Sequence, residues 1–365
     1  MRALLFAVPV SFLACAPAIE ETEREGLGVL GFGRHDVSSV NVKTIADATD
    51  GLREPRDLDF NPEVPGELWI VNRGDDSTVT VSDGVAIKRI DPYAMHFMEE
   101  VSSISFAKND RFATCQESRN TYNGQGAPND FMGPALWSAE PTVFAKSNPA
   151  AVQANGFDLG SHLDMLHESP FCMGIAWEDE NRYFTFDGMD GTISRYDFAE
   201  DHGPGFDDHT DGVIERYVDV DVLRVADVPS HMVFGLDSGE LFVADTGNAR
   251  IGVLDRSTAT LANTVQGLET PIMRMEGASW TTLVDAEDGE LEAPSGIALA
   301  DNVLYVTDNA TSRITAFALD GERLDWLDLD TPAGSLMGLR VGDNGSLFVV
   351  DNLGERVLEI SANDE

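Results

Sequence analysis

A pattern that repeats along the chain is the feature that most limits how this sequence can fold. In the C-terminal half, segments 229–234 and 294–299 both begin Pro-Ser and continue as a short run that is mostly apolar. Each run leads through a polar turn to a second run that ends in aspartate, LFVAD at 241–245 and LYVTD at 304–308. A third run of this kind, LFVVD, spans 347–351. Weaker copies begin near residues 55, 102 and 173, which makes six copies.

Each copy has the composition of an antiparallel β-meander. Its runs alternate and are rich in β-branched residues, and turns of Gly, Asn and Asp separate them. One such sheet cannot bury both of its faces, so the copies must stack against one another. We therefore predict an all-β fold, a six-bladed β-propeller of four-stranded antiparallel blades. The last copy contains three strands, and SVNVKTIAD at 39–47 is expected to supply the fourth and close the ring.

The P-x-G-[IL], LFVAD and N-x-R-[IV] elements of these copies resemble NHL repeats. The resemblance covers residues 39–361 and is strongest in the last three copies. It implies an NHL-type propeller domain over residues 39–365. NHL propellers serve many functions, so the activity must be argued from particular residues.

The N-terminus reads as an export signal. Arg2 precedes an apolar run of about a dozen residues, which is too short to cross a bilayer and typical of a signal peptide. Residues 12–15, FLAC, resemble a bacterial lipobox, which implies lipidation of Cys15 and a lipoprotein signal over residues 1–15. A plain cleaved signal is the alternative. Residues 16–38 are expected to be an acidic tether, with the protein lipid-anchored to a bacterial membrane, periplasmic or at the cell surface.

The charge of the chain excludes one class of partner. The formal net charge is −40, and a field of this sign repels nucleic acid and anionic lipid. The chain has four lysines, and this composition suits either a saline habitat or a secreted acidic surface. We expect a monomer that touches the membrane only through its lipid. If Cys15 carries lipid, Cys115 and Cys172 remain, and two cysteines in an exported protein often form a disulfide.

Loops that feed the innermost strands of a propeller converge at the mouth of its central channel. Arg56 and His231 stand out there among mostly small residues. His96 lies eight residues before Ile104, and His167 lies eight residues before Ile175, so two consecutive blades carry a histidine at the same place. Three imidazoles with an open position suit zinc or copper, so we predict a metal site of His96, His167 and His231. The alternative is that these are ordinary loop histidines.

Three histidines from different NHL blades are similar to the site of peptidyl-α-hydroxyglycine α-amidating lyase. The resemblance implies zinc at the channel mouth and a nearby arginine, for which Arg56 is the match. Pro229-Ser230-His231 is close to the ligand motif of that family, and His96 and His167 lie farther upstream in their loops. No counterpart of the family's catalytic tyrosine is found in the sequence.

A second group of potential ligands lies between two strands of the third blade, where four carboxylates and two histidines occur in eleven residues. This group is able to hold Ca²⁺ or a transition metal, and an acidic solvated turn is the alternative. His162, which lies five residues before His167, is a reserve ligand outside this group. The members of the group are Asp201, His202, Asp207, Asp208, His209 and Asp211.

The long insertion at residues 116–161 combines turn residues with aromatic side chains. We expect an ordered lid over the site, in which aromatic residues such as Phe131 and Trp137 line a cleft. The alternative is that they fasten the loop to the side of the propeller. Together these features predict a metal-dependent lyase or hydrolase that acts on a small or peptide-like substrate, with Arg56 orienting an anionic group. The competing hypothesis is a non-enzymatic surface propeller that binds a protein or glycan.

Overall fold

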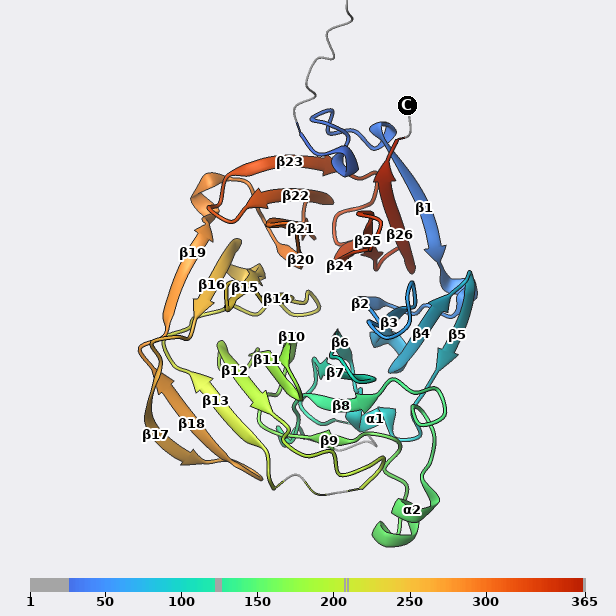
Figure 1. Cartoon of the computed structure of the whole chain (residues 1–365), viewed down its shortest axis with the longest axis vertical. Coiled ribbons are helices and arrows are strands. Elements are labelled where there is room, and N and C mark those ends of the chain that lie inside the picture. Colours follow the sequence, from blue (N-terminus) through green and yellow to red (C-terminus); the bar gives the residue numbers. More distant parts are fainter. Residues whose placement is uncertain (1–25, 122–126, 207, 209, 364–365) are drawn as a thin grey trace, which may run out of the picture.

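A computed structural model of the chain describes residues 26–121, 127–206, 208 and 210–363. It confirms the predicted six-bladed β-propeller, with six sheets arranged radially around one axis (Figure 1). Blades one and two consist of β2 (Pro55–Phe60), β3 (Leu68–Asn72), β4 (Ser77–Ser82) and β5 (Val85–Arg89), then β6 (Val101–Phe106), β7 (Arg111–Gln116), β8 (Ala135–Ser138) and β9 (Asp164–Met165).

Blades three and four begin with β10 (Cys172–Asp179) and β14 (Met232–Gly235) and continue outward. Their other strands are β11 (Arg182–Asp187), β12 (Thr192–Asp197) and β13 (Val213–Tyr217), then β15 (Glu240–Asp245), β16 (Arg250–Asp255) and β19 (Ser279–Val284). Blade five contains β20 (Pro294–Ala300), β21 (Val303–Asp308), β22 (Arg313–Ala318) and β23 (Arg323–Asp328).

Blade six joins the two ends of the domain. Its inner strands are β24 (Leu336–Val341), β25 (Leu347–Asp351) and β26 (Arg356–Ala362), and its outer strand is β1 (Val40–Ala46). β1 pairs antiparallel with β26, with Val42 opposite Ile360. The predicted closure of the ring by an N-terminal strand is therefore confirmed.

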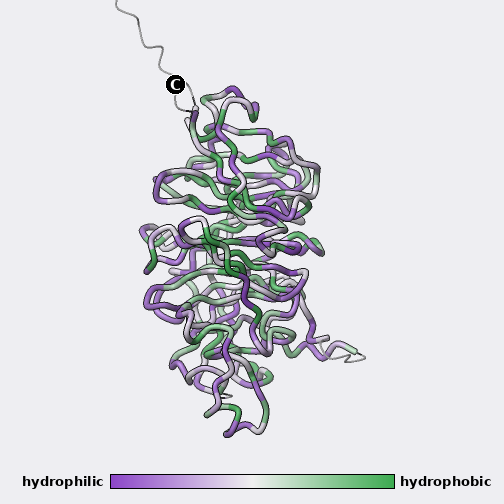
Figure 2. The backbone as a smooth tube through the Cα atoms, turned by 90° about the vertical axis from the view of Figure 1, so that its right-hand side faces the viewer, coloured by the Kyte–Doolittle hydropathy of each residue, from purple (hydrophilic) through white to green (hydrophobic). Residues whose placement is uncertain are grey.

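The cores of the propeller lie between the blades. The inner strands of each blade are covered on both faces by the neighbouring blades. For this reason, runs such as LWIVN in β3 are apolar without strict alternation. Between blades one and two, the ring of Trp69 packs at centroid distances of 5.1 Å from Phe112 and 5.7 Å from Phe106. Seen from the side, hydrophilic residues are prominent in the turns at the edges of the disc (Figure 2).

A hairpin that the repeat pattern did not predict extends blade three. β17 (Thr260–Gln266) and β18 (Pro271–Glu276) lie in sequence between β16 and β19 of blade four. The hairpin leaves its own blade, and β18 pairs in parallel with β13, with Ile272 opposite Ile214. The sheet of blade three thus gains two strands (Figure 1). We call residues 260–276 the strap.

The insertion at 116–161 is only partly the predicted lid. It contains β8, the third strand of blade two, and a short helix, α2 (Pro149–Asn155), that projects from the ring (Figure 1). Trp137 and Met132 are fully buried in the core of blade two and do not line a cleft. The reason is that Trp137 belongs to a blade strand, so its side chain packs against the neighbouring sheet.

From the acidity of the preceding sequence, residues 26–38 are expected to belong to the tether. In the structure they pack against the propeller instead. They include η1 (Gly28–Leu30), and Leu30 is fully buried. The N–H of Leu27 donates to Asp325 at 2.7 Å, and the ring of His35 stacks on Trp326 at 3.2 Å. A buried leucine, a hydrogen bond and a ring stack therefore hold this segment on blades five and six. Residues 1–25, with the predicted signal and Cys15, lie outside the described part of the chain.

Cys115 on β7 and Cys172 on β10 form a disulfide with a Cα–Cα distance of 5.3 Å. This is the pair that the cysteine count favoured, and it joins blades two and three in the core. In the described residues, no helix has the length and apolar character needed to cross a membrane.

Candidate functional site

Two of the predicted ligands meet beside blade two. His96 lies in α1 (Ala94–Phe97), between β5 and β6, and His167 lies between β9 and β10. Their Nε2 atoms are 3.2 Å apart, and both side chains are buried. The equal offset of the two histidines from the next inner strand thus places both in corresponding loops of adjacent blades, where their rings come together.

Two further residues hold the ring of His167 in place. An oxygen of Glu269 lies 2.5 Å from Nδ1 of His167. Phe131, from the insertion, stacks on the same ring with centroids 3.6 Å apart and planes 10° apart. Glu269 lies at the tip of the strap, 102 residues away in sequence, and sequence reasoning did not identify it.

This arrangement determines which nitrogen of His167 is available. A carboxylate accepts hydrogen bonds, so Nδ1 of His167 carries the proton and donates it to Glu269. In a neutral His167 the Nε2 lone pair then faces Nε2 of His96, and without a metal the two nitrogens share a hydrogen bond. Two nitrogens that each bind a metal at about 2.0 to 2.1 Å with a tetrahedral angle lie about 3.3 to 3.4 Å apart. The observed separation of 3.2 Å is therefore suitable for two ligands of one ion.

His231, the third predicted ligand, does not join this pair. The ligand atoms of the three histidines do not form a common group among the described residues. His231 lies at the start of β14, with Nε2 3.2 Å from the carbonyl oxygen of Ser102 and 3.6 Å from Oδ2 of Asp57. Positions at the start of inner strands face the axis, whereas His96 and His167 lie in the loops leading to such strands. The three-histidine set is corrected to a pair.

The state of His231 follows from its surroundings. Burial lowers the pKa of this imidazole, and the charge of Asp57 opposes the effect only in part. Because a carbonyl oxygen only accepts, Nε2 carries the proton and donates to Ser102, so Nδ1 of the neutral ring is unprotonated. Nδ1 is buried without a hydrogen-bond partner among the residues that the structure describes.

Arg56 also lies at the axis and is 3% exposed. Its Nη1 is 3.1 Å from Sδ of Met337, and its Nη2 is 3.9 Å from a carboxylate oxygen of Glu54. Burial and the nearby Arg73 lower the pKa of Arg56. The predicted role of Arg56 in orienting an anionic substrate stays a prediction.

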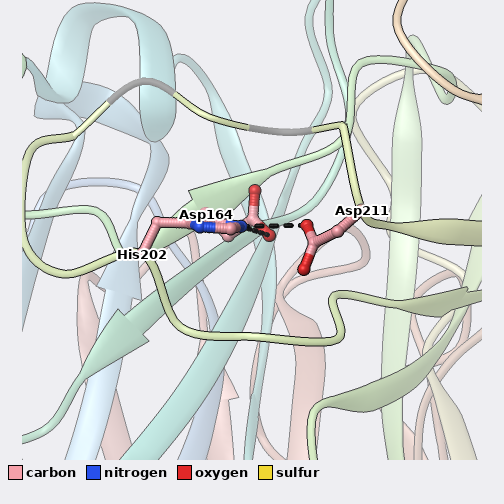
Figure 3. Close-up of side chains that lie close together, drawn as sticks. All are labelled: Asp164, His202 and Asp211. Atoms are coloured by element: carbon pink, nitrogen blue, oxygen red, sulfur yellow. Dashed lines mark hydrogen bonds and ion pairs between the residues drawn. The ribbon is translucent and has the colours of Figure 1, made fainter.

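Part of the second predicted cluster does converge. His202 Nε2 lies 2.9 Å from Asp211 and 4.0 Å from Asp164 (Figure 3). Burial lowers the pKa of His202, but the hydrogen bond and charge of Asp211 outweigh it, and the pKa is raised. These three residues form a candidate cation-binding group. Asp164, on β9, was missed because it is 38 residues from His202 in sequence.

The other members of that cluster have separate contacts or lie outside the described residues, as Asp207 and His209 do. Asp201 pairs with Arg111 at 2.6 Å. Asp208 accepts a hydrogen bond from the hydroxyl of Thr210 at 3.0 Å. The reserve ligand His162 lies in the core of blade two, with Nδ1 2.9 Å from the carbonyl oxygen of Leu159 and its ring stacked on Phe97.

A pocket of 170 Å³ borders the histidine pair on the side of His167. Its lining includes Asp130, Pro170, Asp187, Met189, Arg216 and Leu268. A larger pocket of 640 Å³ lies between blades one and six beside Phe60 and Phe348, and no histidine lines it. Of these two pockets, the smaller one is lined by His167.

No family model matches the chain, and no curated protein matches it in sequence. Solved structures do resemble it. Virginiamycin B lyase from Staphylococcus aureus has a TM-score of 0.50 at 10% identity, over 88% of this chain and 99% of that chain. A luciferin-regenerating enzyme has a TM-score of 0.55 at 13% identity, over 88% and 95%. An auxiliary nutrient binding protein from Bacteroides ovatus has a TM-score of 0.54 at 10% identity, over 89% and 77%. At these identities, the likeness establishes that this chain shares the propeller fold of enzymes and of nutrient-binding proteins.

Proposed function

We propose that this protein is a metal-dependent lyase or hydrolase that acts on a small or peptide-like substrate, with His96 and His167 as protein ligands of the metal. The observation that carries the proposal is the 3.2 Å separation of their Nε2 atoms. The donor set fits zinc or copper, because imidazole nitrogen is a preferred ligand of both. When bound, such an ion acts as a Lewis acid or activates water.

The residues around the pair suit such a centre. Catalytic zinc sites use three protein ligands and keep one position open. The pair here supplies two ligands, so two positions of a tetrahedral ion are left for water and substrate. The 170 Å³ pocket beside His167 offers space for a small group of the substrate. Phe131 covers the ring of His167, so the insertion shields one side of the centre from water. Export and lipid attachment at Cys15 remain part of the proposal and rest on the N-terminal sequence.

Metal analysis of the purified protein tests this function. After supply of zinc or copper, we expect about one ion per chain in the natural protein, and less than a tenth of that in His96→Ala and His167→Ala. His231→Ala is the matched control, because His231 is equally buried but lies apart from the pair. Asp211→Asn separates this site from the candidate group of Asp164, His202 and Asp211. Equal metal content in all variants, or none in the natural protein, would contradict the proposal.

A second candidate is supported by the nutrient-binding neighbour, which has the same fold at a TM-score of 0.54. In this case the protein is a non-enzymatic surface propeller that binds a glycan or protein. Binding of oligosaccharides that is unaffected by chelators and by His167→Ala would favour this second function.

A further inference from the structure

We infer that Glu269 is a positioning residue of the metal centre and that the strap exists to deliver it to His167. The inference rests on the proposed function, because it assigns a role beside the metal that His96 and His167 would hold. It explains a departure from the repeat pattern, in which blade four gives up a hairpin to the neighbouring blade.

The strap is exposed along most of its length but anchored at its tip. Six of the seven residues of β17 are exposed, and Leu268 at the tip is 56% exposed. The residues on either side of Glu269 are nevertheless held. The N–H of Leu268 donates to Glu168, and the hydroxyl of Thr270, which is 2% exposed, donates to the carbonyl of Gly212 at 2.7 Å. The tip is therefore held on both sides of the carboxylate, by the loop between β9 and β10 and by the residue before β13.

The backbone at the tip also excludes a larger side chain. A Cβ added to Gly267 would lie 2.3 Å from an oxygen of Glu168 and 2.3 Å from the carbonyl oxygen of Thr270. Parallel pairing of β18 with β13 fixes the direction from which the tip approaches. These contacts hold the backbone on both sides of Glu269, whose carboxylate lies next to Nδ1 of His167.

Several charged side chains lie close together at the tip of the strap. The strap brings Glu269 near Glu168, and two carboxylates close together repel each other unless positive charge compensates. Arg216, which pairs with Asp187 and Asp190 at 3.0 Å, also offsets the charge of Glu168. The carboxylate of Glu269 contacts Nδ1 of His167.

A carboxylate behind a metal-binding histidine acts in two ways. It fixes the tautomer, here with the Nε2 lone pair toward His96, and it increases the basicity of the ligand. Loss of such a partner typically weakens metal binding by about 10- to 100-fold. Glu269 would thus set the affinity of the centre without touching the metal.

Titration with Zn²⁺ against a chelator, and with Co²⁺ monitored by its visible spectrum, tests the inference. We expect Glu269→Ala to weaken both ions about 10- to 100-fold and to change the Co²⁺ spectrum. Glu269→Gln, which keeps a hydrogen-bond acceptor, should restore part of the affinity. Glu276→Ala, at the exposed end of the same strap, is the matched control and should bind as the natural protein does.

The outcomes separate the two proposals. If the natural protein binds neither ion, the proposed metal function is wrong, and the role of Glu269 fails with it. If the natural protein binds metal and Glu269→Ala binds with the same affinity and spectrum, only the positioning role is overturned. If Glu276→Ala weakens binding as much as Glu269→Ala, the strap acts through general packing and the specific role of Glu269 is also overturned.

Discussion

Burial and the surrounding negative charge shift the pKa values of several side chains in this protein. Burial keeps His231 neutral at the axis. Burial disfavours the charged form of any ionisable side chain. It therefore lowers the pKa of a histidine and raises the pKa of a carboxyl group. Asp76, at the turn before β4, is the clearest case. Burial raises its pKa to about 7, and the nearby Glu99, Glu100 and Asp75 add to the effect.

The raised pKa of Asp76 predicts a pH-dependent stability. A carboxyl whose folded pKa exceeds its unfolded value stabilises the fold below pH 4, and this contribution is lost as pH rises toward 7. Asp76→Asn should therefore be more stable than the natural protein at pH 8, by about 1–2 kcal/mol after allowance for partial exposure, and equal to it near pH 4. Urea unfolding at the two pH values measures this difference.

The backbone at Asp76 permits the change. Asp76 has a φ of 51°, which asparagine tolerates, and its Oδ1 accepts the N–H of Glu100 at 2.8 Å, as an amide oxygen also would. Asp83→Asn is the control, because Asp83 has a φ of 50° but is exposed. A change of more than about 0.5 kcal/mol in the control, or none in Asp76→Asn, would contradict the prediction.

At the scale of secondary-structure elements, each blade corresponds to one sequence repeat, whereas the strap corresponds to none. The runs ending in aspartate become the second strands of blades four to six, where each pairs with the first and third strands of its own blade. The strap also has the composition of two strands, but composition does not show which edge they will join. The disulfide between β7 and β10 is a further link between neighbouring elements.

Removal of this disulfide should destabilise the propeller. The two cysteines are 57 residues apart, and closing a loop of this length in the unfolded chain is worth about 2–4 kcal/mol. We expect the double variant Cys115→Ala, Cys172→Ala to unfold at lower urea concentration by a corresponding amount. Dithiothreitol should lower the unfolding midpoint of the natural protein and leave that of the double variant unchanged. A natural protein whose midpoint does not respond to the reductant would refute the prediction.

At the scale of the whole molecule, the net charge of −40 acts on every part of the fold. Like charges repel one another more strongly in the compact state than in the extended chain. Salt shortens the range of this repulsion, from about 10 Å at 0.1 M to about 3 Å at 1 M.

The melting temperature should therefore rise by several degrees between 0.05 and 1 M NaCl. KCl at equal ionic strength should have the same effect, because screening depends on ionic strength and not on the identity of the cation. Thermal unfolding followed by circular dichroism measures this rise. A melting temperature that falls or stays constant would show that local ion pairs outweigh the overall repulsion.

The sequence alone determined the propeller, its six blades, its closure by the N-terminal strand and the equivalent loop positions of His96 and His167. Each of these depends on a period or an offset that recurs along the chain, so it is visible without coordinates. The tertiary structure decided what no local pattern records. It separated His231 from the pair, placed Trp137 in a core and brought Asp164 beside His202. It also carried Glu269 to His167 across two blades, because the contact depends on which sheet edge the strap joins, and that choice is made only when the blades pack together.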